Sequence, residues 1–298
     1  MIRRARCRRI AAFLLVLSWA GSLGLAQAGA TAVIAFVSER DGNREIYLMD
    51  VDGGNEQRLT RTSGDEDTPS WSPGGDRLAV MYRKGSSWDW DILTMNADGS
   101  DRRTLAGGPA GDWECAWSPD GKLVAFSSTR GGDSEIYVVH TDTGAITQLT
   151  DNPSAIDGLP AWSPDGSTIA FFSDRDGNWE IYRMASDGSD VLRLTQNQSE
   201  RDYGAAWSPD GTRIAFVSAR DGNEEIYVMD ADGSNPRRLT NEPSADTAPN
   251  WSPDGSRIVF SSARSGNGDI YIMNADGGNV VRLTDSPSAD TSPAWRPE

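Results

Sequence analysis

The chain has 298 residues, of which 44 are acidic, 28 are lysine or arginine and one is histidine, so its formal net charge is −16. A chain this acidic repels nucleic acid and anionic membrane surfaces, which argues against a nucleic-acid partner and favours basic partners or cations. Any Ser-His-Asp or Cys-His centre would have to use His140, and no Gly-x-Ser-x-Gly motif is present. The same count excludes zinc sites built on several histidines, so no metal site is predicted.

The first 28 residues have the pattern of a secretory signal peptide. Residues 1–9 hold five arginines and no acid, an apolar run follows over residues 10–25, and Ala26-Gln27-Ala28 offers small residues for cleavage. We therefore expect a periplasmic or secreted protein; retention of the segment as an N-terminal anchor is the alternative. Cleavage would lower the net charge to −21 and leave Cys115 without a disulfide partner. No later apolar run approaches the ~20 residues that span a bilayer.

A repeat of 44 to 46 residues occupies the chain from residue 29 to residue 298. Each repeat is marked by a tryptophan that has proline two positions later, at Trp71, Trp117, Trp162, Trp207, Trp251 and Trp295. A period this regular indicates a repeat architecture.

The fifth repeat shows the strand pattern. It has four β-rich segments, strands A to D, over residues 205–208, 213–218, 225–230 and 238–240. Short turns containing Gly or Asn join A to B, B to C and C to D, which predicts hairpins in one antiparallel sheet. Strand B is apolar at consecutive positions, as in a strand that is covered on both faces. Six such sheets around an axis make an all-β, six-bladed β-propeller of four-stranded antiparallel blades.

Ring closure follows from the two ends of the repeat array. The first repeat, residues 33–60, has strands B, C and D but no strand A, and Trp295 has no strand B after it. We predict that the C-terminal segment, residues 292–296, pairs with the N-terminal blade as its strand A. This pairing would remove open sheet edges.

The repeated elements Trp-Ser-Pro-Asp-Gly, Ile-Ala-Phe, Ile-Tyr-x-Met and Arg-Leu-Thr resemble those of TolB-like six-bladed propellers, over residues 32–297. The resemblance implies a periplasmic protein that binds other proteins of the cell envelope, as in Tol–Pal systems. Residues 29–298 leave no room for the N-terminal domain that TolB carries. The repeat also resembles the propellers of prolyl oligopeptidase-type peptidases, whose chemistry lies on a separate hydrolase domain.

Acidic residues recur at fixed places in the repeat. One carboxylate precedes each tryptophan by five residues, at Glu66, Asp112, Asp157, Asp202, Asp246 and Asp290, and a second precedes the isoleucine of strand C. The B–C turns supply an arginine in most repeats. Because strands alternate in direction, these charges all lie at the end of the propeller that carries the B–C turns and D–A links. They form either a structural clasp between strands or an acidic ring at the channel mouth that binds a cation or a basic segment.

Five aromatic residues lie at this end, at positions that the repeat does not fix: Trp88, Trp90, Trp113, Trp179 and Tyr203. Large aromatic side chains on exposed loops are the usual anchors of protein interfaces. We predict that they bind a partner; the alternative is that each packs locally over the rim of a blade.

These observations favour an exported, monomeric binding or scaffold protein with no cofactor, which contacts a protein partner, basic in character, through the aromatic and acidic end. The single histidine and the uniform repeats argue against an enzyme. The alternative is a carboxylate-dependent hydrolase or lyase that acts on a saccharide at the channel mouth, because spacing alone does not distinguish a catalytic carboxylate pair from a structural one.

Overall fold

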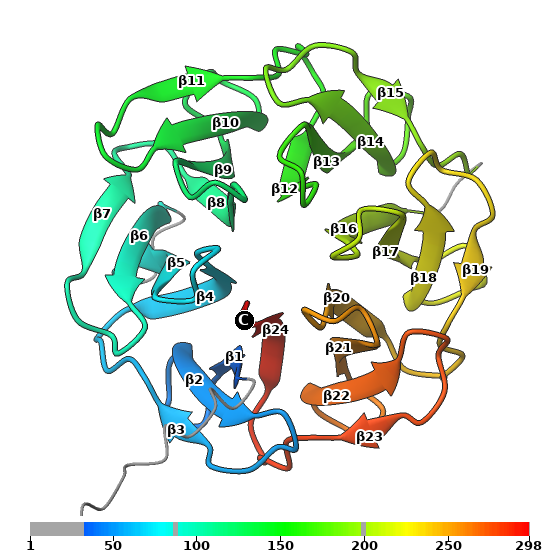
Figure 1. Cartoon of the computed structure of the whole chain (residues 1–298). Helices are drawn as coiled ribbons and strands as arrows, with labels where there is room; N and C mark the ends of the chain where they lie inside the picture. The colour runs from blue at the N-terminus through cyan, green and yellow to red at the C-terminus, as the bar shows by residue number, and fades with distance from the viewer. Residues whose placement is uncertain (1–32, 86–88, 198–200, 298) are drawn as a thin grey trace, which may run out of the picture. The chain divides into compact units, whose positions relative to one another are not determined.

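Six four-stranded antiparallel sheets stand around a central channel, as Figure 1 shows. The computed structural model describes residues 33–85, 89–197 and 201–297, and all of its regular elements are strands. Each sheet is called a blade, and its strands run from A at the channel to D at the outer rim. The predicted signal peptide, residues 1–28, lies outside the described residues. The six-bladed propeller is confirmed.

The strand bounds are as follows. The first blade contains β24 (Asp290–Trp295), β1 (Val33–Ser38), β2 (Glu45–Asp50) and β3 (Gln57–Arg58). The second contains β4 (Asp65–Trp71), β5 (Arg77–Arg83), β6 (Asp91–Asn96) and β7 (Arg103–Ala106). The third contains β8 (Asp112–Trp117), β9 (Leu123–Ser128), β10 (Glu135–His140) and β11 (Ile146–Gln148).

The other three blades follow the same order. The fourth contains β12 (Asp157–Trp162), β13 (Thr168–Ser173), β14 (Glu180–Ala185) and β15 (Leu192–Arg193). The fifth contains β16 (Asp202–Trp207), β17 (Arg213–Ser218), β18 (Glu225–Asp230) and β19 (Arg237–Arg238). The sixth contains β20 (Asp246–Trp251), β21 (Arg257–Ser262), β22 (Asp269–Asn274) and β23 (Val281–Arg282).

The first blade is completed by the C-terminal strand, as predicted. Strand β24 pairs antiparallel with β1, with Trp295 opposite Ile34 and Asp290 opposite Ser38. The Arg296 N–H donates to the Val33 carbonyl at 2.8 Å, which extends the ladder by one bond. The ring is therefore closed by hydrogen bonds between segments more than 250 residues apart in the sequence.

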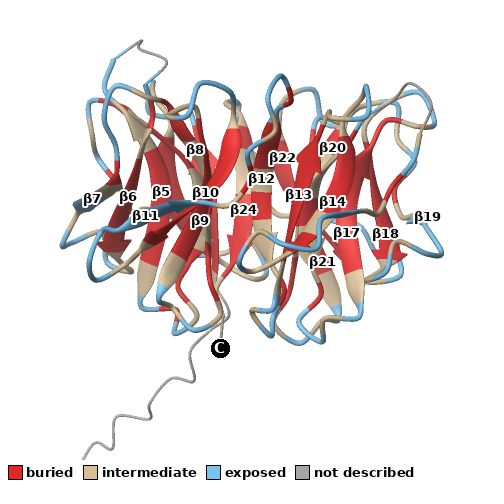
Figure 2. Cartoon of the chain, turned by 90° about the horizontal axis from the view of Figure 1, so that it is seen from above, coloured by how far each residue is buried: buried red, intermediate tan, exposed pale blue. Residues whose placement is uncertain are grey.

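The core lies in the middle two strands of each blade, which are buried on both faces, as Figure 2 shows. Strand B carries a phenylalanine with no exposed area in every blade except the second, at Phe36, Phe126, Phe171, Phe216 and Phe260. Each packs on the tyrosine opposite it in strand C, with ring centroids 5.7–5.9 Å apart. Burial of one such ring contributes about 1.5–3 kcal/mol, so the blade interfaces supply much of the stability.

Three of the tryptophans that mark the repeat form a hydrogen bond to the preceding blade. The indole Nε1–H of Trp207 donates to the Ala161 carbonyl of the fourth blade at 3.2 Å, and Trp251 donates to Ala206 at 3.1 Å. Trp71 makes the same bond to Ala294 across the closure. A tryptophan suits this position because its large ring fills the space between two blades and its N–H donates to a carbonyl of the preceding blade.

Strand A begins earlier than the sequence pattern indicated and contains a β-bulge. In the fifth blade, Tyr203 is opposite Val217 and Ala206 is opposite Ala215, so strand A has one extra residue. The residue three before each tryptophan has a positive φ, at Thr68, Glu114, Leu159, Gly204, Ala248 and Ser292. A bulge bends the strand and re-aims its side chains, and these six residues line the channel.

Within the described residues, no helix is long and apolar enough to cross a membrane.

Candidate functional site

The six carboxylates expected at the channel mouth, Glu66, Asp112, Asp157, Asp202, Asp246 and Asp290, have no exposed area. The expectation of a ring that faces solvent is therefore corrected. Asp202 shows the reason: its backbone N–H donates to the Trp179 carbonyl of the preceding blade at 2.8 Å, and all six residues make the equivalent bond. This bond holds the start of strand A against the neighbouring blade, so the carboxylate lies inside the junction between blades.

Each of these carboxylates is paired with an arginine, as the clasp interpretation predicted. In the fifth blade, Arg220 Nη2 lies 2.7 Å from Asp202 Oδ2, while Arg220 Nε donates to Ser218 Oγ at 2.7 Å. The guanidinium also lies over the Phe216 and Tyr227 rings. Arg40, Arg130, Arg175 and Arg264 repeat this arrangement in four other blades. In the second blade, which has no such arginine in its B–C turn, Arg102 pairs with Glu66 instead.

The strand C carboxylates of all blades except the second form a second clasp with a threonine hydroxyl. Glu225 has no exposed area, and it accepts hydrogen bonds from Thr240 Oγ1 at 2.6 Å, Arg238 Nη2 at 2.8 Å and the Glu242 N–H at 2.8 Å. The Thr240 hydroxyl in turn accepts the Ile226 N–H at 2.9 Å. The Arg-Leu-Thr sequence therefore recurs because its arginine and threonine satisfy a buried carboxylate, which would otherwise be costly to bury.

The two sets of acids meet between blades. Burial raises the pKa of the Asp202, Asp246 and Asp290 carboxyls, and the nearby Glu180 and Glu225 charges raise the pKa of the first two further. One oxygen of each of the three accepts no hydrogen bond. These groups therefore act on stability and its dependence on pH, and they offer no open surface to a ligand.

The predicted aromatic residues divide into two groups. Trp88 lies outside the described residues. Trp90 is only 5% exposed, with the Arg83 guanidinium 4.6 Å from its ring centroid, and it packs in the core between the second and third blades. The expectation that Trp90 is exposed is therefore corrected, because its ring is covered by Arg83 and its own blade. Trp113 is half-buried against the same core.

Trp179 and Tyr203 come together, from the B–C turn of the fourth blade and strand A of the fifth. The Trp179 ring stacks on Phe172 with centroids 4.4 Å apart, and Tyr203 meets it edge to face at 5.8 Å. The Arg201 guanidinium lies within 6 Å of both rings. Trp179 and Tyr203 are half-buried, so the cluster presents part of its aromatic surface to solvent.

A cavity of about 620 Å³ opens beside this cluster, between the B–C turns of the fourth and fifth blades. Trp179, Arg201 and Glu224 line it, and Glu224 accepts hydrogen bonds from Arg201 and from the Tyr203 hydroxyl, the latter at 2.9 Å. Burial raises the pKa of the Tyr203 hydroxyl, and the neighbouring Glu224 carboxylate raises it further, so Tyr203 remains a neutral donor. We call Phe172, Trp179, Arg201, Tyr203 and Glu224 the aromatic cluster.

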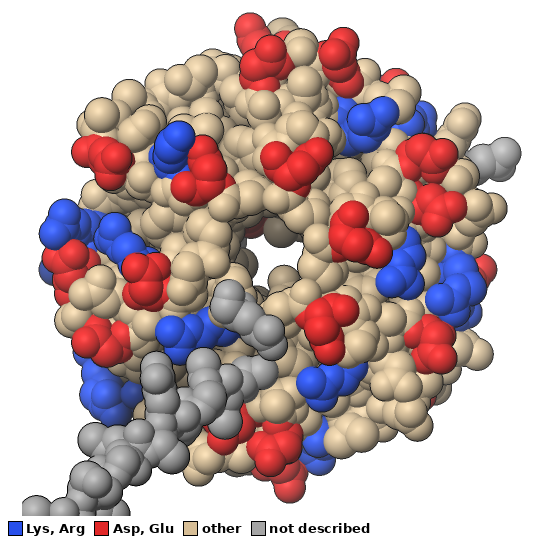
Figure 3. Space-filling view, viewed as in Figure 1, with Lys and Arg blue, Asp and Glu red and all other residues tan. Residues whose placement is uncertain are grey.

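The central channel contains a second cavity of about 340 Å³. Figure 3 shows the channel as an opening in a face that carries scattered acidic and basic side chains. Its wall is formed by the bulge residues of strand A. Glu114 is the bulge residue of the third blade, and its Oε2 accepts hydrogen bonds from Ser127 Oγ and the Leu159 N–H, both at 2.8 Å. Burial raises the pKa of the Glu114 carboxyl and that of the Cys115 thiol, the latter to about 12.

Comparison with known proteins gives the family. The model of the TolB beta propeller domain matches residues 109–205 and 197–298, which together cover well over half of the chain. The chain belongs to the TolB β-propeller domain family. A similar protein is the Tol-Pal system protein TolB of Desulfosudis oleivorans, which is 35% identical over 118 residues. That match spans 39% of this chain but only 26% of the relative.

Solved structures agree with this family. TolB from Acinetobacter baumannii superposes with a TM-score of 0.78 and 24% identity over 90% of this chain and 67% of that one. A putative TolB from Agrobacterium tumefaciens has a TM-score of 0.71 and 27% identity, over 87% of this chain and 91% of that chain. The family model matches residues 109–298, and the structural matches show that the same propeller fold covers most of the chain.

In this TolB-type propeller, sequence reasoning missed three members of the aromatic cluster. Phe172 reads as an ordinary core residue of strand B, and Arg201 and Glu224 read as two more surface charges. The available signal was the pairing of two aromatic residues, Trp179 and Tyr203, at unconstrained positions of consecutive repeats. His140 lies away from this cluster, at the end of β10, where its Nδ1 accepts the Asp142 N–H at 3.2 Å.

Proposed function

We propose that this chain is an exported binding propeller without catalytic activity, which holds a protein partner at the end that carries the B–C turns and D–A links. The observation that carries the proposal is the aromatic cluster, where stacked and partly exposed rings adjoin a cavity of about 620 Å³. Aromatic and arginine side chains beside a pocket are the typical anchors of a protein interface.

The cluster is better suited to bind a peptide segment of a partner than to bind a flat surface of a partner. Its cavity offers an apolar wall from Trp179, a donor from Arg201 and an acceptor from Glu224 within one site. Such a mixture lets a partner insert one side chain and satisfy its backbone groups at the rim. The acidic balance of the chain favours a basic partner through long-range attraction.

Localisation in the periplasm is supported by the N-terminal pattern of residues 1–28 and by the similarity to TolB proteins. Mass spectrometry of the protein recovered from the periplasm tests it directly: we expect a chain that begins at Gly29. A protein that retains residues 1–28 in the membrane fraction would contradict this part of the proposal.

The binding role is tested by cross-linking. A photoreactive phenylalanine at position 179 is expected to capture one envelope protein, and the purified partner is then titrated against Trp179→Ala and Tyr203→Ala. Both variants should lose binding at least tenfold. Val281→Ala, which changes a 53% exposed residue on the outer rim, is the matched control and should bind normally. Equal binding by all three variants would overturn the proposal.

A further inference from the structure

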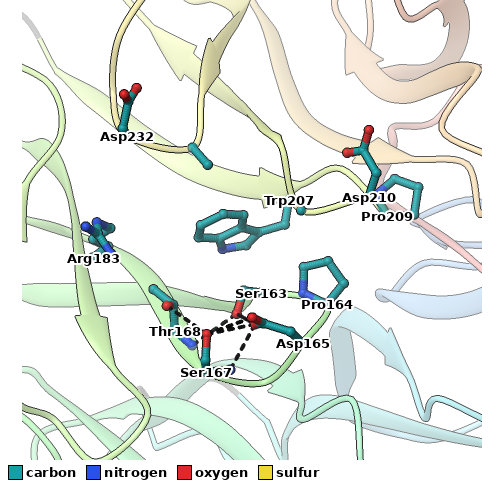
Figure 4. A pocket seen from close by; sticks show the side chains of 12 residues that line it. Ser163, Pro164, Asp165, Ser167, Thr168, Arg183, Trp207, Pro209, Asp210 and Asp232 are labelled. Carbon is teal, nitrogen blue, oxygen red and sulfur yellow. Dashed lines mark hydrogen bonds between the residues drawn. The ribbon is translucent and has the colours of Figure 1, made fainter.

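A cavity of about 610 Å³ lies at the opposite end of the propeller, between the fourth and fifth blades. It is formed by the A–B and C–D turns and is therefore separate from the aromatic cluster. Figure 4 shows the Trp207 ring at its centre, with Arg183 on one side and Pro164 and Pro209 on the other. Trp207 is partly exposed, unlike the equivalent residues of most other blades.

At three other junctions of the ring, an arginine covers the equivalent tryptophan. The Arg213 guanidinium lies 4.7 Å from the Trp251 ring centroid, Arg257 lies 5.3 Å from Trp295, and Arg296 lies 5.3 Å from Trp71. The three covered tryptophans are only 5–6% exposed. A guanidinium over an indole face is a favourable cation–π contact, so the protein itself uses arginine to close this site three times.

At Trp207, the position that supplies the covering arginine of Trp251 and Trp295 holds a threonine. Arg213 is the first residue of β17 and is opposite Asp230, whereas the same register position in β13 is Thr168, opposite Ala185. Threonine is too short to reach the indole face. Leu123 stands at this position in the third blade, and Trp162 is half-exposed there too, but the cavity lies at Trp207.

The charges that line the cavity favour a cation. Asp165, Asp210 and Asp232 oppose a single guanidinium, that of Arg183. Hydrogen bonds from Ser163, Ser208 and Ser234, respectively, lower the pKa of these three carboxyls, so all are ionised at neutral pH. The lining therefore carries a net charge of about −2 in a chain that is itself strongly acidic, which attracts basic ligands.

We propose that this cavity binds an arginine side chain of a basic protein segment, whose guanidinium lies over the Trp207 ring as Arg213 lies over Trp251. The ligand replaces an intramolecular contact that the fold makes at three other junctions, so no rearrangement of the blade is needed. This site is independent of the proposed function, because it lies at the other end of the propeller and uses none of the aromatic cluster.

Arg183 is the feature that opposes this assignment. It replaces the buried aliphatic residues Val228 and Ile272 of other blades, and its Nε is buried without a hydrogen-bond partner. If Arg183 were instead the anchor of the site, the ligand would be an anion bound through a carboxylate. The two assignments predict opposite effects of replacing Arg183, which makes it the discriminating position.

The test uses the purified protein labelled with 5-fluorotryptophan and observed by fluorine NMR, with the Trp207 resonance assigned from Trp207→Phe. The probe is acetyl-(Gly-Arg)₃-amide, and the same peptide with citrulline is its uncharged control. We expect a saturable shift of the Trp207 resonance with the arginine peptide, and at least tenfold weaker binding of the citrulline peptide. The absence of a Trp207 shift, or equal binding of the two peptides, would overturn the proposal.

Three variants sharpen the test. Thr168→Arg restores the covering arginine and should abolish the shift at Trp207 without lowering the melting temperature. Arg183→Leu should bind the arginine peptide at least as tightly as the original protein; loss of binding there would overturn the proposal in favour of an anion site. Arg213→Ala uncovers Trp251, whose resonance should then respond to the peptide as a second site. If Arg213→Ala is unstable, the first two variants still decide the question.

Discussion

The clasp on strand C makes a quantitative prediction for Thr240→Val, which replaces a hydroxyl by a methyl group of similar size. The Thr240 hydroxyl donates to buried Glu225 at 2.6 Å and accepts the Ile226 N–H at 2.9 Å, and Thr240 itself is 5% exposed. Valine removes a hydrogen bond to a charged group, which contributes about 1.5–3 kcal/mol, and leaves a buried N–H without an acceptor. The expected loss of unfolding free energy is about 3 kcal/mol.

This loss converts to a melting-temperature shift. At about 2.1 cal/mol/K per residue, a propeller of about 265 residues has an unfolding entropy of about 0.55 kcal/mol/K, so the midpoint should fall by about 5 °C. Differential scanning calorimetry at pH 7 measures this directly. Thr247→Val is the control, because Thr247 is half-buried in β20 and its hydroxyl makes no hydrogen bond within the described residues. A Thr240→Val midpoint within 1 °C of the original protein, or an equal loss in Thr247→Val, would refute the clasp.

Three further predictions concern pH, the cysteine and the tryptophans. Burial raises the folded-state pKa of Asp202, so its contribution to stability is fully present below the unfolded pKa of about 4 and is lost as pH rises through the folded pKa. The melting temperature should therefore fall as the pH rises from about 4, and a rise would contradict this prediction. Asp210, whose pKa the Ser208 hydroxyl lowers to about 2, acts oppositely, and stability should fall again below about pH 3. Burial raises the pKa of Cys115 to about 12, so Ellman's reagent should label it at pH 8 only after denaturation, and rapid labelling of the native protein would count against its burial. Trp90→Ala should lower the unfolding free energy by about 3–5 kcal/mol, clearly more than Trp179→Ala in urea titrations, and equal losses would show that Trp90 is not the more buried of the two.

The blade could be predicted from sequence because its signals are local. The turn residues Pro209-Asp210-Gly211 and the apolar run of strand B predicted a four-stranded blade, in which β17 and β18 begin and end at the predicted residues and β19 begins one residue earlier than predicted. The missing strand A of the first repeat was enough to predict that β24 closes the ring. Strand A itself was predicted too short because its bulge was not foreseen. The bulge residue has a positive φ in all six blades, but it is a glycine only in the fifth, at Gly204, so the sequence hardly indicates it.

The site was harder to predict because it depends on distances across blades. The repeated acids looked like a ring at the channel mouth, and burial of Asp202 and its equivalents follows from a backbone bond to the preceding blade that no spacing reveals. Trp90 and Trp179 occupy the same place in the repeat, yet Arg83 covers the first, while the second stacks on Phe172 and stays half-exposed. The two tryptophans differ because their own blades, the second and the fourth, supply different neighbouring side chains. A pattern common to all repeats does not contain these neighbours.

Closure of the ring is tested most directly by removing β24. A chain that ends at residue 289 lacks the strand that pairs with β1, so the Trp71 indole loses its acceptor Ala294 and the first blade loses its inner edge. Moving residues 290–297 to a position before Val33, joined through an Asp-Gly turn like that at Asp210-Gly211, should restore the pairing as a hairpin. Calorimetry is expected to show loss of the single cooperative transition in the truncated chain and its recovery in the permuted one. A truncated chain that melts at the temperature of the intact protein would contradict ring closure by β24.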